Sequence, residues 1–337
     1  MSKRIPGRSA CSIFIIIALL LLWCFPDAAV ATRNRQSPRV TQIQNQPWLW
    51  TFNTGYRQDS LDWSIAGDTS GNNPNILSEL TWTDLEIFQI EGGLERRFRR
   101  NFILGGTLAY GLIFDGKVQD SDYLGDNRTM EFSRSNNSAD DGDTWDLSVE
   151  FGYEFLFGSG TFGLTPLVGY SYHLQKLKMT NGVQTVSEYG FPLPIGPFPG
   201  LNSSYDARWH GPWTGLDFDI RVFRKKSAMP RHGFKFGFEY HFYADYYAEA
   251  DWNLRSDFEH PKSFEHEADG SGVILTGAYN FYFDSRWSLD LNGKYQKWQT
   301  DPGTDRVFFA DGTQVETRLN EVNWESYSVL LGVTCRF

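Results

Sequence analysis

Strict alternation of apolar and polar residues constrains this chain more than any other feature of its sequence. In the closing stretch "ESYSVLLGVTCRF", Tyr327, Val329, Leu331, Val333, Cys335 and Phe337 fall on one face, opposite Ser326, Ser328, Gly332, Thr334 and Arg336. Segments 145–155, 234–245 and 287–296 follow the same rule. Successive side chains of a β-strand point to opposite faces of the sheet, so each segment is predicted to be a strand with one apolar and one polar face.

The composition of the apolar face indicates lipid rather than a packed core. The chain has 27 Phe, 16 Tyr and 12 Trp, and these aromatic residues crowd the apolar face near both ends of long strands. Strands of soluble sandwiches are typically about five or six residues long. Lipid-facing strands are longer, carry aromatic residues at both interfaces and enclose a polar interior. Since an open sheet edge in hydrocarbon leaves amide groups unpaired, the sheet must close.

Ten such segments predict a ten-stranded antiparallel transmembrane β-barrel, an all-β fold. They lie roughly at 47–57, 77–95, 102–114, 143–157, 160–175, 209–224, 232–248, 270–284, 286–299 and 323–337. An even number suits a bacterial single-chain barrel. The second segment alternates poorly, so we expect a bulge or a stretch away from lipid there.

Connections between these segments alternate in length. Short ones contain Gly158-Ser159-Gly160, Asp284-Ser285-Arg286, "RRFRRN" and "KKSAMPRHG"; long polar ones lie near 58–76, 115–142, 176–208, 249–269 and 300–322. Barrels of this kind have short periplasmic turns and longer extracellular loops. We therefore expect four short periplasmic turns and five long outer loops, integral to the outer membrane of a Gram-negative cell.

The amino end resembles a secretory leader. Lys3, Arg4 and Arg8 precede an apolar run from Ile13 to Phe25, and Ala29-Val30-Ala31 offers a cleavage site. The expected organisation is a signal peptide at 1–31, a periplasmic segment at 32–46 and the barrel at 47–337. Beyond residue 31 the chain has 28 basic and 40 acidic residues, a net charge of −12, which excludes nucleic acid as a partner. Only Cys335 remains there, so neither an internal disulfide nor a cysteine-rich metal site is expected.

Four motifs, in order along the chain, resemble the omptins, the outer-membrane proteases of Gram-negative bacteria. They are "SELTW" (78–82), "QDSDY" (119–123), "WDLSVEFGYEF" (145–155) and "WHGPWTGLDFDI" (209–220). The chain is also similar to an omptin-like branch typified by the Protochlamydia outer membrane proteins. The resemblance implies the ten-stranded barrel and a site at its outer mouth.

In the proteases an aspartate pair faces an Asp-x-His dyad across the mouth, and the two sides hold a water. By resemblance Asp120 and Asp122 match the pair, which we expect in a loop just beyond the third strand. Comparison without gaps puts the dyad at Trp252 and Leu254, and neither side chain can accept a proton. A shifted register offers Asp257 and His260 as weak candidates. The resemblance therefore lacks its general base, and a solvated or vestigial role for Asp120 and Asp122 is preferred.

Other candidate sites have simpler interpretations. Calcium capture by Asp115, Asp120, Asp122 and Asp126 is an alternative without a recognisable loop geometry. The omptin motif for lipopolysaccharide matches Tyr170, Tyr172 and Leu174, which lack its acid and base. Mixed charges predicted to face the lumen are expected to pair and stiffen the barrel: Glu150, Glu154, His173, Asp217, Asp219, Arg221, Lys235, Glu239, His241, Asp290 and Lys294.

Three functions remain open. The first is a structural, adhesive or binding barrel at the cell surface, favoured by the missing dyad. The second is an omptin-type endopeptidase that cuts peptides after basic residues, which an acidic pocket attracts. The third is a pore for small solutes, although ten strands close a narrow lumen. The expected partner is outer-membrane lipid, with lipopolysaccharide and host surface molecules as candidates; no cofactor or metal is expected, and the sequence leaves the oligomeric state open.

Overall fold

The computed structural model describes residues 48–99, 101–224 and 229–337. Its strands are β1 (Trp48–Ile65), β2 (Ser78–Phe98), β3 (Phe102–Gly125), β4 (Thr129–Ser138), β5 (Gly142–Tyr153), β6 (Phe155–Phe157), β7 (Phe162–Ser187), β8 (Gly196–Pro197), β9 (Asn202–Phe223), β10 (Pro230–Asp251), β11 (Phe264–Tyr282), β12 (Trp287–Thr300), β13 (Gly303–Phe308) and β14 (Gln314–Arg336). Among the described residues, a 3₁₀ turn at Gly158–Gly160 lies between β6 and β7. None of these described residues forms a helix long and apolar enough to cross a membrane. The predicted leader at 1–31 and the segment at 32–46 lie outside the described residues.

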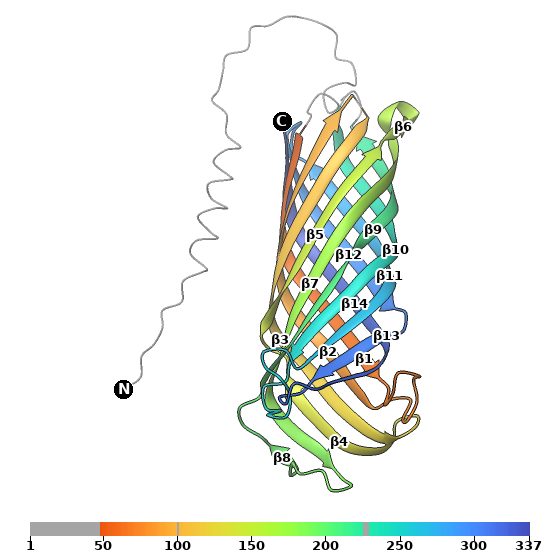
Figure 1. Ribbon diagram of the computed structural model, residues 1–337. Helices are drawn as coiled ribbons and strands as arrows, with labels where there is room; N and C mark the ends of the chain where they lie inside the picture. The colour runs from red at the N-terminus through yellow and green to blue at the C-terminus, as the bar shows by residue number, and fades with distance from the viewer. Residues whose placement is uncertain (1–47, 100, 225–228) are drawn as a thin grey trace, which may run out of the picture. The chain divides into compact units, whose positions relative to one another are not determined.

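The strands form one closed antiparallel ring (Figure 1). Neighbouring strands of the ring run antiparallel, and β1 pairs with β14 to close the sheet, from Leu49 opposite Arg336 to Ile65 opposite Leu319. Two positions in the ring are each shared by two strands: β4 and β5 both lie between β3 and β7, while β12 and β13 both lie between β11 and β14. The predicted ten-stranded barrel is confirmed. The expected bulge in the second segment is also present, as register shifts around Glu86.

The two ends of the barrel differ. At one end, called the turn end, β2, β6, β9 and β11 end and short connections follow them, among them residues 158–161 and 283–286. The other end is called the loop end (Figure 1). There β4, β8 and β13 extend the wall of the barrel, and the longer connections join the strands. The predicted contrast between four short connections and longer ones at the opposite end is therefore confirmed.

The outer surface near the turn end is apolar, as the alternation predicts. Every second residue of a strand there is an exposed aromatic or aliphatic side chain, for example Phe236 and Phe238 on β10 and Val329 and Leu331 on β14. On β3 this outer band ends at Phe114, because exposed Lys117 and Gln119 follow. A band of this kind is the surface that a bilayer covers.

The predicted loops are much shorter than expected, because the strands continue beyond the apolar band. β1 continues to Ile65, β3 to Gly125 and β7 to Ser187, while β9 already begins at Asn202. The predicted strand ends were wrong because each strand was expected to stop where its outer face ceased to be apolar. Outside the membrane the ladder continues with a polar outer face instead, since its hydrogen bonds do not depend on lipid.

β9 shows how the two faces exchange character along one strand. Near the loop end its inward residues are Tyr205, Ala207 and Trp209, and its outward residues are Asp206, Arg208 and His210. Near the turn end the inward residues are Asp217, Asp219 and Arg221, and the outward ones are Leu216, Phe218 and Val222. The pairing of β9 with β7 has no register shift, so the exchange comes from the sequence and not from a bulge.

The inward apolar residues fill the lumen of the loop-end half. We call the largest of them the aromatic plug: Trp63, Trp82, Tyr205, Trp209, Tyr246, Phe264, Trp298 and Trp324, all buried. Their rings meet across the barrel rather than along one wall. Trp209 of β9 lies 5.9 Å from Trp298 of β12 and 6.3 Å from Trp324 of β14, between ring centroids. The plug packs like a soluble core.

Candidate functional site

The acidic pair, Asp120 and Asp122, lies on β3 and not in a loop as expected. Asp120 pairs in register with Leu80 of β2 and Ser135 of β4, and Asp122 with Ser78 and Ser133. Val118, two residues earlier on the same face, belongs to the buried cluster around the plug. Both carboxyl groups therefore point inward, above the plug at the loop end, and both are partly buried.

Burial dominates the electrostatics of the acidic pair. It raises the pKa of Asp120 well above the ordinary value, and the charge of Asp122 raises it further. Burial also raises the pKa of Asp122, although hydrogen bonds from Ser78 and Ser133 oppose this shift. Two carboxyl groups in one partly desolvated site resist ionising together. The pair therefore retains a proton to a higher pH than two exposed aspartates do.

Arg255 is the cation that acts on both members of the pair. Its charge lowers the pKa of Asp120 and of Asp122, against the effect of burial. Its own pKa is raised, first by the hydrogen bond to Asp257 and also by both aspartates. Nε and Nη2 of Arg255 lie 2.9 and 2.8 Å from the two carboxylate oxygens of Asp257. The charge of the guanidinium thus acts on the acidic pair from the connection between β10 and β11.

Contacts on both sides fix that connection. Asn253 donates to the carbonyl oxygen of Gly200 and accepts from the backbone N–H of Asn202. On the other side, the backbone N–H of Ala310 donates to the carbonyl oxygen of Asp257, and the Phe258 ring packs edge-on against Phe309. Arg255 is therefore held in place by neighbouring loops and not only by its ion pair.

His260 has an acidic partner, but not the one expected. His260 Nδ1 lies 2.6 Å from Asp251 Oδ1, at the end of β10, and both side chains are partly exposed. Asp257, the partner suggested by sequence, is engaged by Arg255 instead. Asp251 was missed because nine residues separate it from His260, and a spacing rule for one strand does not detect a contact made across a loop.

Trp252 and Leu254, the positions of the dyad by ungapped comparison, have other roles. The Trp252 ring packs edge-on against Phe264 of the plug, with centroids 4.7 Å apart, whereas Leu254 is exposed. Neither is placed to handle a proton. Arg255, which lies between the matched positions, is the functional candidate that the sequence comparison missed.

The structure separates the four aspartates considered for calcium. Asp115 accepts from the backbone N–H of Gly116, and Asp126 accepts from that of Asn75. Across residues 48–99, 101–224 and 229–337, no three His, Cys, Asp or Glu side chains are grouped to hold a metal. Tyr170, at the first position of the lipopolysaccharide motif, is bonded to His210 Nδ1 at 2.8 Å.

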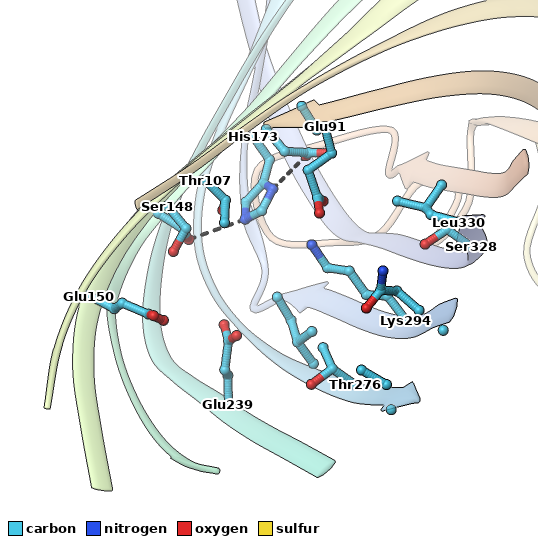
Figure 2. A pocket seen from close by; sticks show the side chains of 18 of the residues that line it. Glu91, Thr107, Ser148, Glu150, His173, Glu239, Thr276, Lys294, Ser328 and Leu330 are labelled. Carbon is cyan, nitrogen blue, oxygen red and sulfur yellow. Dashed lines mark hydrogen bonds and ion pairs between the residues drawn. The ribbon is translucent and has the colours of Figure 1, made fainter. Parts of the chain in front are cut away.

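Beneath the plug the lumen is polar. One cavity of about 220 Å³ receives side chains from several strands, and Figure 2 shows Glu91, Thr107, Glu239 and Lys294 converging on it. Many of the predicted lumen charges form pairs, such as His173 with Asp146 at 2.7 Å and Lys235 with Asp217 at 2.7 Å. On β3, buried Ile113 and Val118 of the cluster around the plug lie between Ala109, which lines this cavity, and Asp120. The mouth and the lower lumen are thus separate compartments.

Comparison with solved structures finds the same fold in the outer membrane protease OmpT from Escherichia coli. The TM-score is 0.70 at 14% sequence identity, and the match covers 87% of this chain and 97% of that one. A Pseudomonas aeruginosa FadL homologue matches with a TM-score of 0.30 and 10% identity over 88% of this chain and 92% of that one, too weak a likeness to carry an argument. No curated protein matches.

The ring of strands, its apolar outer band and its likeness to OmpT define an omptin-like outer-membrane β-barrel. A family model described as Protochlamydia outer membrane protein matches residues 51–337. The chain belongs to that family, as the sequence motifs suggested.

Proposed function

We propose that the protein is a closed surface barrel that binds ligands at its loop end and performs no peptide hydrolysis. This proposal places the loop end outside the cell and the turn end in the periplasm, in keeping with the usual lengths of such connections. The observation that carries it is Arg255, which Asp257 holds in the connection between β10 and β11 and whose charge acts on the acidic pair. Arginine remains protonated in proteins and cannot serve as a general base there.

The chemistry of the mouth indicates the kind of ligand. Asp120 and Asp122 lie partly buried, so a ligand cation that replaces Arg255 beside them would restore their ionised form. Lysine or arginine side chains of an external peptide or protein meet this need. We propose that the ligand is a basic segment of a host or bacterial surface molecule.

Binding of a short dibasic peptide to the refolded barrel tests this function. Affinity should fall in Asp122→Asn and stay unchanged in His260→Ala, because the first change removes the charge that the ligand needs. Arg134→Gln, a loop-end arginine paired with Glu131, serves as a matched control. Peptide affinity that is equal in all four proteins would contradict the proposal.

A second candidate is omptin-type proteolysis, and the 2.6 Å contact between His260 and Asp251 favours it. Asp251 would orient His260, which would accept a proton from a water held against the acidic pair. Cleavage of the same peptide, lost in both Asp122→Ala and His260→Ala, would establish this function. If the peptide stays intact after prolonged incubation, proteolysis is excluded and binding remains as the proposed function.

The third function, a pore, has no observation in its favour. Rings of the plug meet across the lumen, and most of their contacts join strands that are not neighbours in the ring. We propose that the protein passes no solute in this form. Step currents from the wild-type barrel in a planar bilayer would overturn this view.

A further inference from the structure

Five arginines lie on or near the outer rim of the turn end. Arg96 is near the end of β2 and Arg99 follows it, Arg224 follows β9, Arg231 opens β10, and Arg286 lies between β11 and β12. Arg231 is partly buried and the other four are exposed. We call this set the basic arc. It is independent of the mouth and of what binds there.

Two members of the basic arc stack on aromatic rings at the edge of the apolar band. The guanidinium carbon of Arg96 lies 4.9 Å from the centre of the Trp48 ring, and that of Arg231 lies 4.3 Å from the centre of the Phe281 ring. Aromatic residues at the end of a transmembrane strand mark the level of the lipid headgroups. The stacking therefore holds both positive charges at headgroup level, with their stems along the apolar surface.

The basic arc differs from most other described arginines, Arg318 and Arg336 apart, in its lack of acidic partners. Inside the lumen, Glu154 holds both Arg97 and Arg221. At the loop end, Arg134 pairs with Glu131 and Arg306 with Glu316. Within the described ranges, by contrast, none of the five forms an ion pair with a carboxylate.

The few acidic groups at the turn end do not neutralise the arc. The Asp284 carboxylate accepts the backbone N–H groups of Arg286 and Trp287. Glu95 and Glu154, also toward this end, are engaged by Arg97 and Arg221 instead. Five cations without matching acids leave a local excess of positive charge at the edge of the membrane band.

The arc extends around most of the ring. Following the sheet from β9 through β10, β11, β12, β14 and β1 to β2 passes every member of the arc. On the opposite side, around β3, β6 and β7, the turn end is lined by phenylalanines, among them Phe102, Phe157 and Phe162. The positive rim is thus interrupted only around β3, β6 and β7, where phenylalanines take its place.

We propose that the basic arc binds the phosphate groups of anionic phospholipids in the leaflet that meets the turn end. A guanidinium matches a phosphate with two parallel hydrogen bonds, and arginine is the residue best suited to this contact. The acyl chains of the same lipids cover the adjacent apolar band. The lipid is thus recognised by its headgroup charge and retained by its tails.

Native mass spectrometry of the full barrel tests this inference. The barrel is equilibrated in neutral detergent with equal amounts of phosphatidylglycerol and phosphatidylcholine, which differ in headgroup charge. We expect phosphatidylglycerol adducts to dominate. Arginines are then replaced one after another, from Arg96→Gln to the triple variant Arg96→Gln/Arg231→Gln/Arg286→Gln. The preference for phosphatidylglycerol over phosphatidylcholine should fall roughly fivefold for each arginine removed. Salt should weaken the preference in the wild type, because the arginines are exposed to solvent.

The matched control is Arg134→Gln/Arg306→Gln, which removes paired arginines at the loop end and should leave the preference intact. Equal binding of the two lipids by the wild type would overturn the inference, as would a triple variant that keeps the full preference. If the triple variant does not fold, the wild-type preference and its loss with salt decide the question on their own.

Discussion

Trp82 of β2 stacks on Tyr205 of β9, with ring centroids 5.3 Å apart and planes inclined by 25°. In the ring of strands, β3, β4, β5 and β7 lie between these two strands. The contact therefore spans the lumen and ties opposite walls together. It makes the loop-end half of the barrel a packed core whose stability is testable by substitution.

Trp209→Ala should destabilise the barrel by about 3–5 kcal/mol, the usual cost of removing a large buried aromatic side chain. Trp209 is fully buried and contacts Trp298, Trp324 and Tyr246. Urea unfolding in lipid vesicles, followed by loss of β-sheet circular dichroism, measures the change. Trp145→Ala, on the exposed outer surface, is the control and should cost much less.

Removing the plug should open the lumen. In the triple variant Trp209→Ala/Trp298→Ala/Trp324→Ala, the three rings that meet across the barrel are gone, and the polar cavities beneath become continuous with the mouth. We expect discrete currents from this variant in a planar bilayer and none from the wild type. A silent triple variant that is correctly folded would show that other side chains close the barrel.

Asp120→Asn should raise the melting temperature at neutral pH. The raised pKa of Asp120 means that the folded chain keeps a proton where the unfolded chain, with a pKa of about 3.9, has lost it. Stability from this group is therefore full below the unfolded pKa and decreases as pH rises through the folded pKa. The difference between variant and wild type should vanish in acid, and melting curves across pH will check this. A constant difference at all pH values would exclude the titration as its cause.

Arg255→Gln should raise the pKa of the acidic pair, because it removes the cation that favours both ionised carboxylates. It should also strengthen the binding of a dibasic peptide at neutral pH, since the ligand no longer competes with the guanidinium. Calorimetric titration measures the affinity. Weaker binding in this variant would indicate that Arg255 contacts the ligand instead of blocking it.

Arg57→Met should destabilise the barrel by about 3–5 kcal/mol, because Asp59 and Asp146 would remain buried without their cation. Each carboxylate lies 2.6 Å from the buried guanidinium. Arg128→Met, whose side chain is exposed beside Glu79, is the control and should change stability by less than about 1 kcal/mol. Denaturant midpoints of both variants, compared with the wild type, provide the measurement.

Alternation was sufficient to predict the lipid-facing part of each strand and the closed ring. Throughout the membrane-facing part of the barrel, apolar residues point outward and polar residues point inward. The rule fails beyond the membrane, where the inward face becomes apolar. On β9 the exchange was visible in the order Tyr205, Ala207, Trp209 followed by Asp217, Asp219 and Arg221. It could have been detected by following each face separately along the strand.

The site was less predictable than the fold, since its contacts join distant segments. The pairing of His260 with Asp251 depends on the path of a loop, and the approach of Arg255 to the acidic pair depends on ring closure. Neither follows from a local pattern. The motif located Asp120 and Asp122 but did not reveal the cation opposite them.

The exchange of faces along β9 also fixes how deep the barrel lies in the bilayer. Sliding it toward the turn end would draw Asp206, Arg208 and His210 into hydrocarbon, and sliding it the other way would lift the loop-side edge of the apolar band, Leu216 on β9, into water. Both displacements cost free energy, so the wall has one preferred vertical position. The acidic pair is thereby kept at a constant height above the membrane surface.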